Sequence, residues 1–115
     1  MEFYAEQLEE QLYHLMEEVA DLGPKWAELQ GEVTNLEDRK YDYLAKLTFQ
    51  APGESNTEKE RNARLTPEWE VWRRTVRKQK KECLLLKIKY DVAIKKWETY
   101  RSLLSSKNTE RKTYL

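Results

Sequence analysis

Two long series of residues, each advancing in alternating steps of three and four, constrain the fold of this chain more than any other feature. Such steps place all members of a series on one face of a helix, as in the seam of a coiled coil. Each helix then needs a partner along that face. The first series is Leu8, Leu12, Leu15, Val19, Leu22, Trp26, Leu29, Val33, Leu36, Lys40, Tyr43 and Leu47, and the second is Trp69, Trp72, Val76, Gln79, Cys83, Leu86, Tyr90, Ala93, Trp97, Tyr100 and Leu104.

Between the two series lies a segment with the composition of a loop. Residues 51–56 read Ala-Pro-Gly-Glu-Ser-Asn, and proline and glycine there end the first helix. Thr57 with Glu60 three residues later forms a capping box, which predicts the start of a short helix. Thr66 followed by Pro67 has the pattern of an N-cap and a first helical residue, so the last long helix is expected to begin there.

The predicted fold is therefore all-α, with a long antiparallel helical hairpin and a short helix in the connecting loop. We expect one domain over residues 1–115. It contains a first helix over 1–50 that is kinked near Gly23-Pro24, a loop with a short helix over 51–66, a second long helix over 67–106 and a frayed polar tail over 107–115. The seam keeps its phase across Gly23-Pro24, which favours a kinked helix over two coaxial ones, although a break there stays open.

The two series also suggest one antiparallel register. If the numbers of facing residues sum to 119, Lys40 faces Gln79, so the only polar residue of each seam lies in the same layer. In this register Trp26 faces Ala93, a large side chain against a small one. A polar layer of this kind is a known way to fix register.

Charge is unevenly distributed along the chain, although its net charge is zero. Residues 1–56 contain 13 acids and 4 bases, a balance of −9, and residues 57–115 contain 8 acids and 17 bases, a balance of +9. In the predicted hairpin the loop end, residues 39–81, has 12 bases and 6 acids, and the opposite end has a balance of −6. Such asymmetry indicates interaction surfaces.

The basic residues near the predicted loop suggest a surface for a phosphate backbone. They are Lys59, Arg61, Arg64, Arg73, Arg74, Arg77, Lys78, Lys80 and Lys81. Aromatic side chains beside such a patch can stack on the bases of a single strand, which gives Trp69 and Trp72 a candidate role. Two alternatives stay open, because both tryptophans occupy seam positions typical of a core and the cations can pair with acids of the partner helix.

Heptad positions separate the basic residues of the last helix into two groups. With Trp69 at position a, Arg74, Arg77, Lys78 and Lys81 fall at b, c and f and face away from the partner helix. Only Arg73 and Lys80, at position e, reach across to it.

A second group of apolar residues lies outside the seam of the last helix. The candidate oligomer interface consists of Leu84, Leu85, Ile88 and Val92. A two-helix hairpin has no third layer to cover these residues, and exposed apolar stripes commonly mark interfaces. We therefore expect a homo-oligomer, with folding back of the N-terminal part over the stripe as the alternative.

The sequence offers no catalytic, metal or cofactor site. His14, the only histidine, has no nearby cysteine, and Cys83 lies in the seam as a small core residue. We find no glycine-rich phosphate loop and no nucleophile motif, so no enzyme is expected. No run of about 18 apolar residues is present, the first residues are acidic, and the single cysteine favours a reducing compartment. A cytoplasmic protein without membrane contact is expected.

Part of the chain resembles a family of phage proteins. The pattern consists of Tyr41, Tyr43 and Ala45 before a glycine-containing loop, then Thr57, Arg61 and Ala63, then a long helix that ends in Arg-Ser-Leu-Leu-Ser-Ser at 101–106. Over residues 40–106 this layout is similar to the UvsY-type recombination mediators of tailed phages, whereas the acidic first 38 residues depart from it. The resemblance implies a helical oligomer in the host cytoplasm that binds single-stranded DNA beside a single-strand-binding protein and a RecA-like recombinase. By the same resemblance Arg61 and the basic outer face correspond to the DNA-contacting region.

Two functions follow as hypotheses. In the first, the chain is a phage-type recombination accessory protein that holds single-stranded DNA at its basic loop end and a protein partner on its acidic arm, residues 1–38. In the second, it is a structural or regulatory coiled-coil module, such as a scaffold, adaptor or inhibitor, with no nucleic-acid role.

Overall fold

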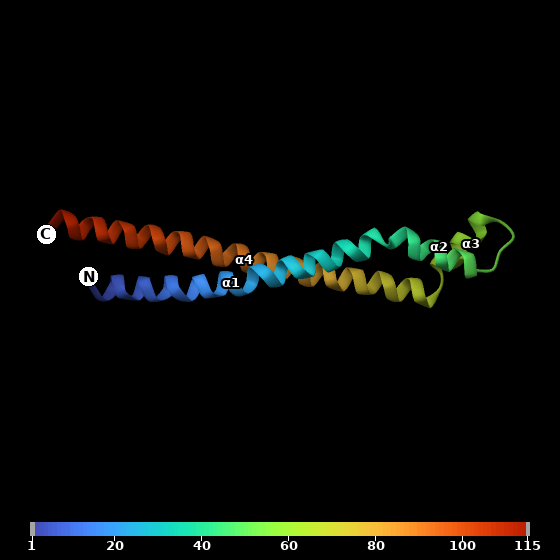
Figure 1. Cartoon of the computed structure of the whole chain (residues 1–115), viewed down its shortest axis with the longest axis horizontal. Coiled ribbons are helices and arrows are strands. Elements are labelled where there is room, and N and C mark those ends of the chain that lie inside the picture. Colours follow the sequence, from blue (N-terminus) through green and yellow to red (C-terminus); the bar gives the residue numbers. More distant parts are fainter. Residues whose placement is uncertain (1, 115) are drawn as a thin grey trace. The chain divides into compact units, whose positions relative to one another are not determined.

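The computed structural model describes residues 2–114, and their side chains from residue 5 to residue 110. Four helices follow one another: α1 (Glu2–Asp38), α2 (Lys40–Gln50), α3 (Asn56–Arg64) and α4 (Pro67–Tyr114) (Figure 1). The predicted all-α fold is confirmed. Contacts divide the chain, expected as one domain, into two compact units: unit 1 comprises Met1–Ala27 with Leu85–Leu115, and unit 2 comprises Glu28–Leu84.

The two predicted seams are the buried faces of the long helices. Of all the seam residues only Lys40 is exposed, and the others are buried or half-buried. In unit 1 the two helical segments run in opposite directions side by side (Figure 1). In unit 2 Glu37 of α1 contacts Lys80, whereas Tyr43, further along the chain, contacts Trp72, which also makes the pairing antiparallel. The helical hairpin is thus confirmed within each unit.

The register differs from the predicted one. Trp26 stacks on Tyr90, with ring centroids 5.9 Å apart, one helical turn before the expected Ala93. Gly23 allows this approach, because a Cβ there would lie 3.2 Å from Cε2 of Tyr90. Two large rings therefore lie together where the sequence suggested that Trp26 faces a small side chain.

Helix α1 continues through Gly23 and Pro24 without a break, since residues 2–38 form one helix. Proline removes one backbone donor and normally disfavours a helix interior. Here Leu22 and Trp26, on either side, belong to the packed seam, and their burial offsets that cost.

The interruption lies instead at Arg39, where α1 ends and α2 begins. The backbone hydrogen bonds nearly continue, because the Arg39 N–H donates to Asn35 and the Tyr43 N–H donates to Arg39. Beyond Arg39 the buried face rotates: Lys40 is exposed, Leu44 is buried beside half-buried Tyr43, and Leu47 stays buried as predicted. The predicted polar layer of Lys40 and Gln79 is therefore wrong, since Lys40 is exposed while Gln79 stays in the seam.

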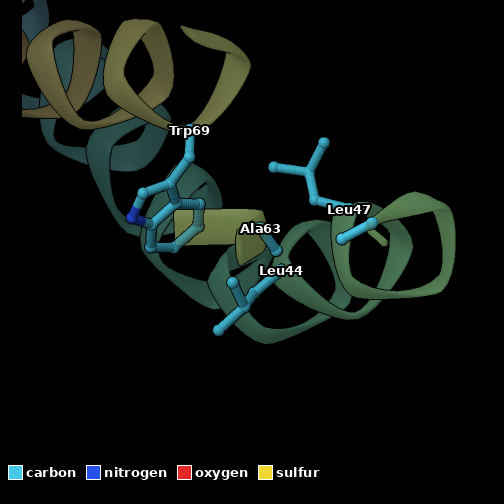
Figure 2. Close-up of a cluster of buried hydrophobic side chains, with 5 residues drawn as sticks. Leu44, Leu47, Ala63 and Trp69 are labelled. Carbon is cyan, nitrogen blue, oxygen red and sulfur yellow. The ribbon is translucent and has the colours of Figure 1, made fainter. Parts of the chain in front are cut away.

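The shift of phase is explained by α3, against which α2 packs. Ala63 of α3 is fully buried among Leu44, Leu47, Ala51 and Trp69 (Figure 2). A side chain as small as alanine permits α3 to approach closely, so α2 turns its leucines toward α3 as well as toward α4.

Short-range capping sets both ends of the connecting segment. The N-cap of α3 is Ser55, two residues before the expected capping residue Thr57, because the hydroxyl of Ser55 accepts the N–H of Glu58 at 3.1 Å. The predicted start of α4 is confirmed: Thr66 Oγ1 accepts the N–H of Trp69 at 3.3 Å, and Pro67 is the first helical residue.

Helix α4 extends beyond residue 106, where the sequence predicted its end. After Pro67 the sequence contains no further proline or glycine that would stop a helix. The hydroxyl of Thr109 donates to the carbonyl of Ser105 inside this last part. The helical segment therefore includes residues 107–114, which the sequence predicted to be a frayed tail.

Gly53 occupies a backbone conformation that other residues rarely adopt, with φ of 151°. A Cβ at this position would lie 3.0 Å from the backbone nitrogen of Lys59. We expect Gly53→Ala to lower the free energy of unfolding by about 1–3 kcal/mol, measured by urea denaturation. Gly31→Ala is the matched control: it lies inside α1, meets no atom within 4 Å, and is expected to stabilise by about 0.5–1 kcal/mol.

Gln79 places a polar atom in the seam of unit 2 without a partner. Its side-chain oxygen is buried and accepts no hydrogen bond from any described residue. Because an unsatisfied buried acceptor is costly, we expect Gln79→Leu to raise the free energy of unfolding by about 1–2 kcal/mol. A melting temperature equal to or below that of the parent would contradict this, and Gln30→Leu at an exposed position of α1 is the control.

Candidate functional site

A groove in unit 2, with a volume of about 790 Å³, brings together four of the nine predicted cations and both candidate tryptophans. We call it the basic groove. Its lining residues come from all four helices and are Glu37, Lys40, Tyr41, Arg64, Trp69, Trp72, Arg73, Val76, Arg77 and Lys80. Five cations and one acid therefore share a surface with three aromatic rings.

Helix α4 supplies the longest side of the groove. Arg73, Arg77 and Lys80 follow one another at spacings of four and three, which places them in a row on one helical face. Trp69 and Val76 lie on the adjoining buried face. Because burial of the seam fixes the rotation of α4, it also fixes the direction of this row of cations.

Stacked rings form the apolar base of the groove. The centroids of Trp69 and Trp72 lie 5.0 Å apart, and the ring of Tyr43 stacks on both. Trp69 is only 5% exposed and belongs to the core, so the core interpretation of this residue is confirmed. Trp72 remains half-buried.

The open aromatic ring at the groove is that of Tyr41, which is 76% exposed. The ammonium of Lys40 lies 5.9 Å from the centroid of this ring. Neither Lys40 nor Tyr41 is among the binding residues predicted from the sequence, because the periodicity places Lys40 in the seam. The signal that would have found them is the apolar set Leu44, Leu47 and Ala51, which has helical spacing and leaves Lys40 and Tyr41 outside.

Few of the predicted cations are neutralised by the chain itself. Lys80 pairs with Glu37 across the helices, as its heptad position predicted, and Arg74 pairs with Glu70 along α4 at 3.1 Å. Within the part of the chain that the structure describes, the other seven form no ion pair. Eight of the nine predicted cations are exposed to solvent, and Lys59 is half-buried.

The groove separates the nine predicted binding residues into two groups. Four of them line it: Arg64, Arg73, Arg77 and Lys80. The other five, Lys59, Arg61, Arg74, Lys78 and Lys81, lie outside it.

The predicted apolar stripe on α4 is exposed. Leu84 is 58% exposed, Leu85 and Ile88 are each 49% exposed, and Val92 is 45% exposed. No described part of the chain covers these four residues fully, so the N-terminal part does not fold back over them.

Other candidate residues have ordinary surroundings. His14 is exposed, and its ring nitrogens lie 3.8 Å from carboxylates of Glu10 and Glu17. Cys83 is a free, half-buried thiol. Among the described residues, no group of three or more His, Cys, Asp or Glu side chains is placed to hold a metal ion, and no helix is both long and apolar enough to cross a membrane.

The chain matches no protein-family model, and comparisons with curated proteins and with solved structures give no match either.

The roles of the aromatic residues can be separated by mutation. We expect Trp69→Ala to lower the free energy of unfolding by about 3–5 kcal/mol in urea denaturation, because it empties the core between α2, α3 and α4. Tyr41→Ala, at an exposed ring, is the control and is expected to change stability by no more than about 0.5 kcal/mol. Equal losses for the two variants would contradict the assignment of Trp69 to the core.

Proposed function

We propose that this chain binds single-stranded nucleic acid through the basic groove of unit 2. The observation that supports the proposal most is the groove itself, where five cations and only one acid share a surface with an open aromatic ring. A row of arginines and lysines along a helix suits the successive phosphate groups of a nucleic-acid strand.

Ion pairing within the chain favours an external anion. Of the five groove cations only Lys80 has a carboxylate partner among the described residues. Lys40, Arg64, Arg73 and Arg77 remain available to phosphate oxygens. Arginine is suited to such a site, because its planar guanidinium group can donate two hydrogen bonds to one phosphate.

The aromatic residues favour a single strand over a duplex. Tyr41 presents an exposed ring beside the cations, and unpaired bases can stack on such a ring. In a duplex the faces of the bases are covered by their neighbours. The stacking residue in this proposal is Tyr41 in place of the buried Trp69.

Single-stranded DNA binding is also what the resemblance to UvsY-type mediators implies. We extend the proposal to a recombination accessory role, in which a recombinase or a single-strand-binding protein contacts the acidic arm. Weak, salt-sensitive contacts suit a protein that must release its strand to another protein.

The experiment is a salt titration of binding to a fluorescein-labelled oligothymidylate, followed by anisotropy. If all five groove cations neutralise phosphates, the logarithm of the association constant should fall with the logarithm of salt concentration with a slope of about −3.5. Arg64→Gln/Arg73→Gln/Arg77→Gln should weaken binding and reduce the slope to about −1.4, because three of those contacts are lost. An unlabelled duplex of equal length should compete poorly.

A second triple variant tests whether the groove is the site or whether any cation of α4 suffices. Arg74→Gln/Lys78→Gln/Lys81→Gln removes the same charge from exposed positions outside the groove. This second variant should reduce the magnitude of the salt-dependence slope by less than the first variant does. The helicity of the two variants, measured by circular dichroism, should be equal. The proposal fails if the parent does not bind at low salt, or if both triple variants bind equally.

The second candidate function is a structural or regulatory coiled-coil module without a nucleic-acid role. The exposed apolar stripe of Leu84, Leu85, Ile88 and Val92 favours it, since such a surface fits protein contact. Absence of oligonucleotide binding in the titration would favour this second function.

A further inference from the structure

Unit 1 has an unequal distribution of charge between its two helical segments. From Ala5 to Ala27, α1 has six acids and one base, whereas α4 has six bases and three acids from Leu85 to Glu110. The ion pairs described between acids and bases within unit 1 are all local, as for Asp21 with Lys25 and Lys107 with Glu110. Most of the acids of one segment and the bases of the other are therefore not neutralised by each other.

The bases of α4 border an exposed apolar surface. Leu85, Ile88 and Val92 are each close to half exposed, and we call them the α4 surface. Lys89 lies one turn from both Leu85 and Val92, and Lys95 and Lys96 lie one turn beyond Val92. These three lysines are exposed and have no ion pair with a described residue.

The acids of α1 border a second exposed apolar surface. Tyr13 is 62% exposed and Met16 is 57% exposed, and with exposed Ala20 they form what we call the α1 surface. Glu9, Glu10 and Glu17 lie within one turn of Tyr13. Glu9 has no ion pair with a described residue. Glu10 and Glu17 lie near the imidazole of His14, and Glu17 also forms a hydrogen bond with the side chain of Tyr13.

The two surfaces match in pattern as well as in charge. In both, the apolar residues are spaced by three and then four positions, which covers about 10 Å of helix. Within one chain the surfaces do not cover each other, because the large residues of both remain exposed.

We propose that unit 1 associates with a second copy of this chain, with the α1 surface of one copy seated on the α4 surface of the other. The apolar side chains are then buried between helices, and glutamates face lysines at the border. Complementary charge sets which surfaces meet. The contact shares no residue with the basic groove, so it stands independently of nucleic-acid binding.

Charge also excludes the two symmetric alternatives. Contact between two α4 surfaces would bring Lys89, Lys95 and Lys96 of both copies together. Contact between two α1 surfaces would do the same with the glutamates. Like charges placed opposite each other in an interface are strongly unfavourable, whereas the mixed contact places these lysines of one copy opposite the glutamates of the other.

The test uses two charge-reversed variants of the full chain and sedimentation velocity. The lysine-reversed variant is Lys89→Glu/Lys95→Glu/Lys96→Glu, and the glutamate-reversed variant is Glu9→Lys/Glu10→Lys/Glu17→Lys. The parent should sediment as an oligomer that dissociates as salt is raised. Each variant alone should associate more weakly than the parent, and its dissociation constant should be about a hundredfold higher.

An equimolar mixture of the two variants should regain association, because every mixed contact between them again joins opposite charges. A chain with all six reversals should associate as the parent does, which also controls for folding together with helicity by circular dichroism. The proposal is overturned by a monomeric parent, or by a glutamate-reversed variant that keeps the mass of the parent, since that would indicate contact between two α4 surfaces. A mixture that stays monomeric overturns it as well.

Discussion

Packing of Trp69 against its neighbours is the contact on which unit 2 depends. The ring meets Trp72 of its own helix and Tyr43 of α2, and fully buried Ala63 of α3 belongs to the same core (Figure 2). Three helices are therefore fixed around one side chain. This packing also sets the positions of groove cations, because Arg64 comes directly after Ala63 and Arg73 lies one turn beyond Trp69. Burial of apolar neighbours, with little help from ion pairs, gives these cations their positions.

The seams could be predicted from sequence because a step of three or four has one physical meaning. The seam residues from Leu8 to Leu36 and from Trp69 to Leu104 are all buried or half-buried, as their spacing requires. The register could not be predicted in the same way. The predicted register rests on the size and polarity of facing residues. In the structure Trp26 stacks on Tyr90, because Gly23 leaves room for the ring. A missing side chain gives no periodic signal.

The interruption at Arg39 could not be predicted in the same way, because the alternating steps of three and four continue through Lys40 to Tyr43. What shifts the buried face is α3, a neighbour formed by residues further along the chain. The consequence for the groove is specific: Lys40 and Tyr41 line it but were not among the predicted binding residues, whereas Arg73, Arg77 and Lys80 of α4 were predicted and line it. Outward positions on a long regular helix can be predicted, but those beside a helix junction depend on tertiary contacts.

The charge pattern of α4 is difficult to explain by the helical hairpin alone. Arg73, Arg77 and Lys81 are cations four residues apart, and each such pair destabilises a helix by a few tenths of a kcal/mol. A hairpin whose only requirement was stability would be better served by alternating charges on this exposed face. In the nine residues from Arg73 to Lys81 the described structure neutralises only Arg74 and Lys80. Burial of the apolar seam offsets this repulsion. In the proposed function an external anion would relieve it, so that repulsion within the free helix would contribute to the binding of a phosphate chain.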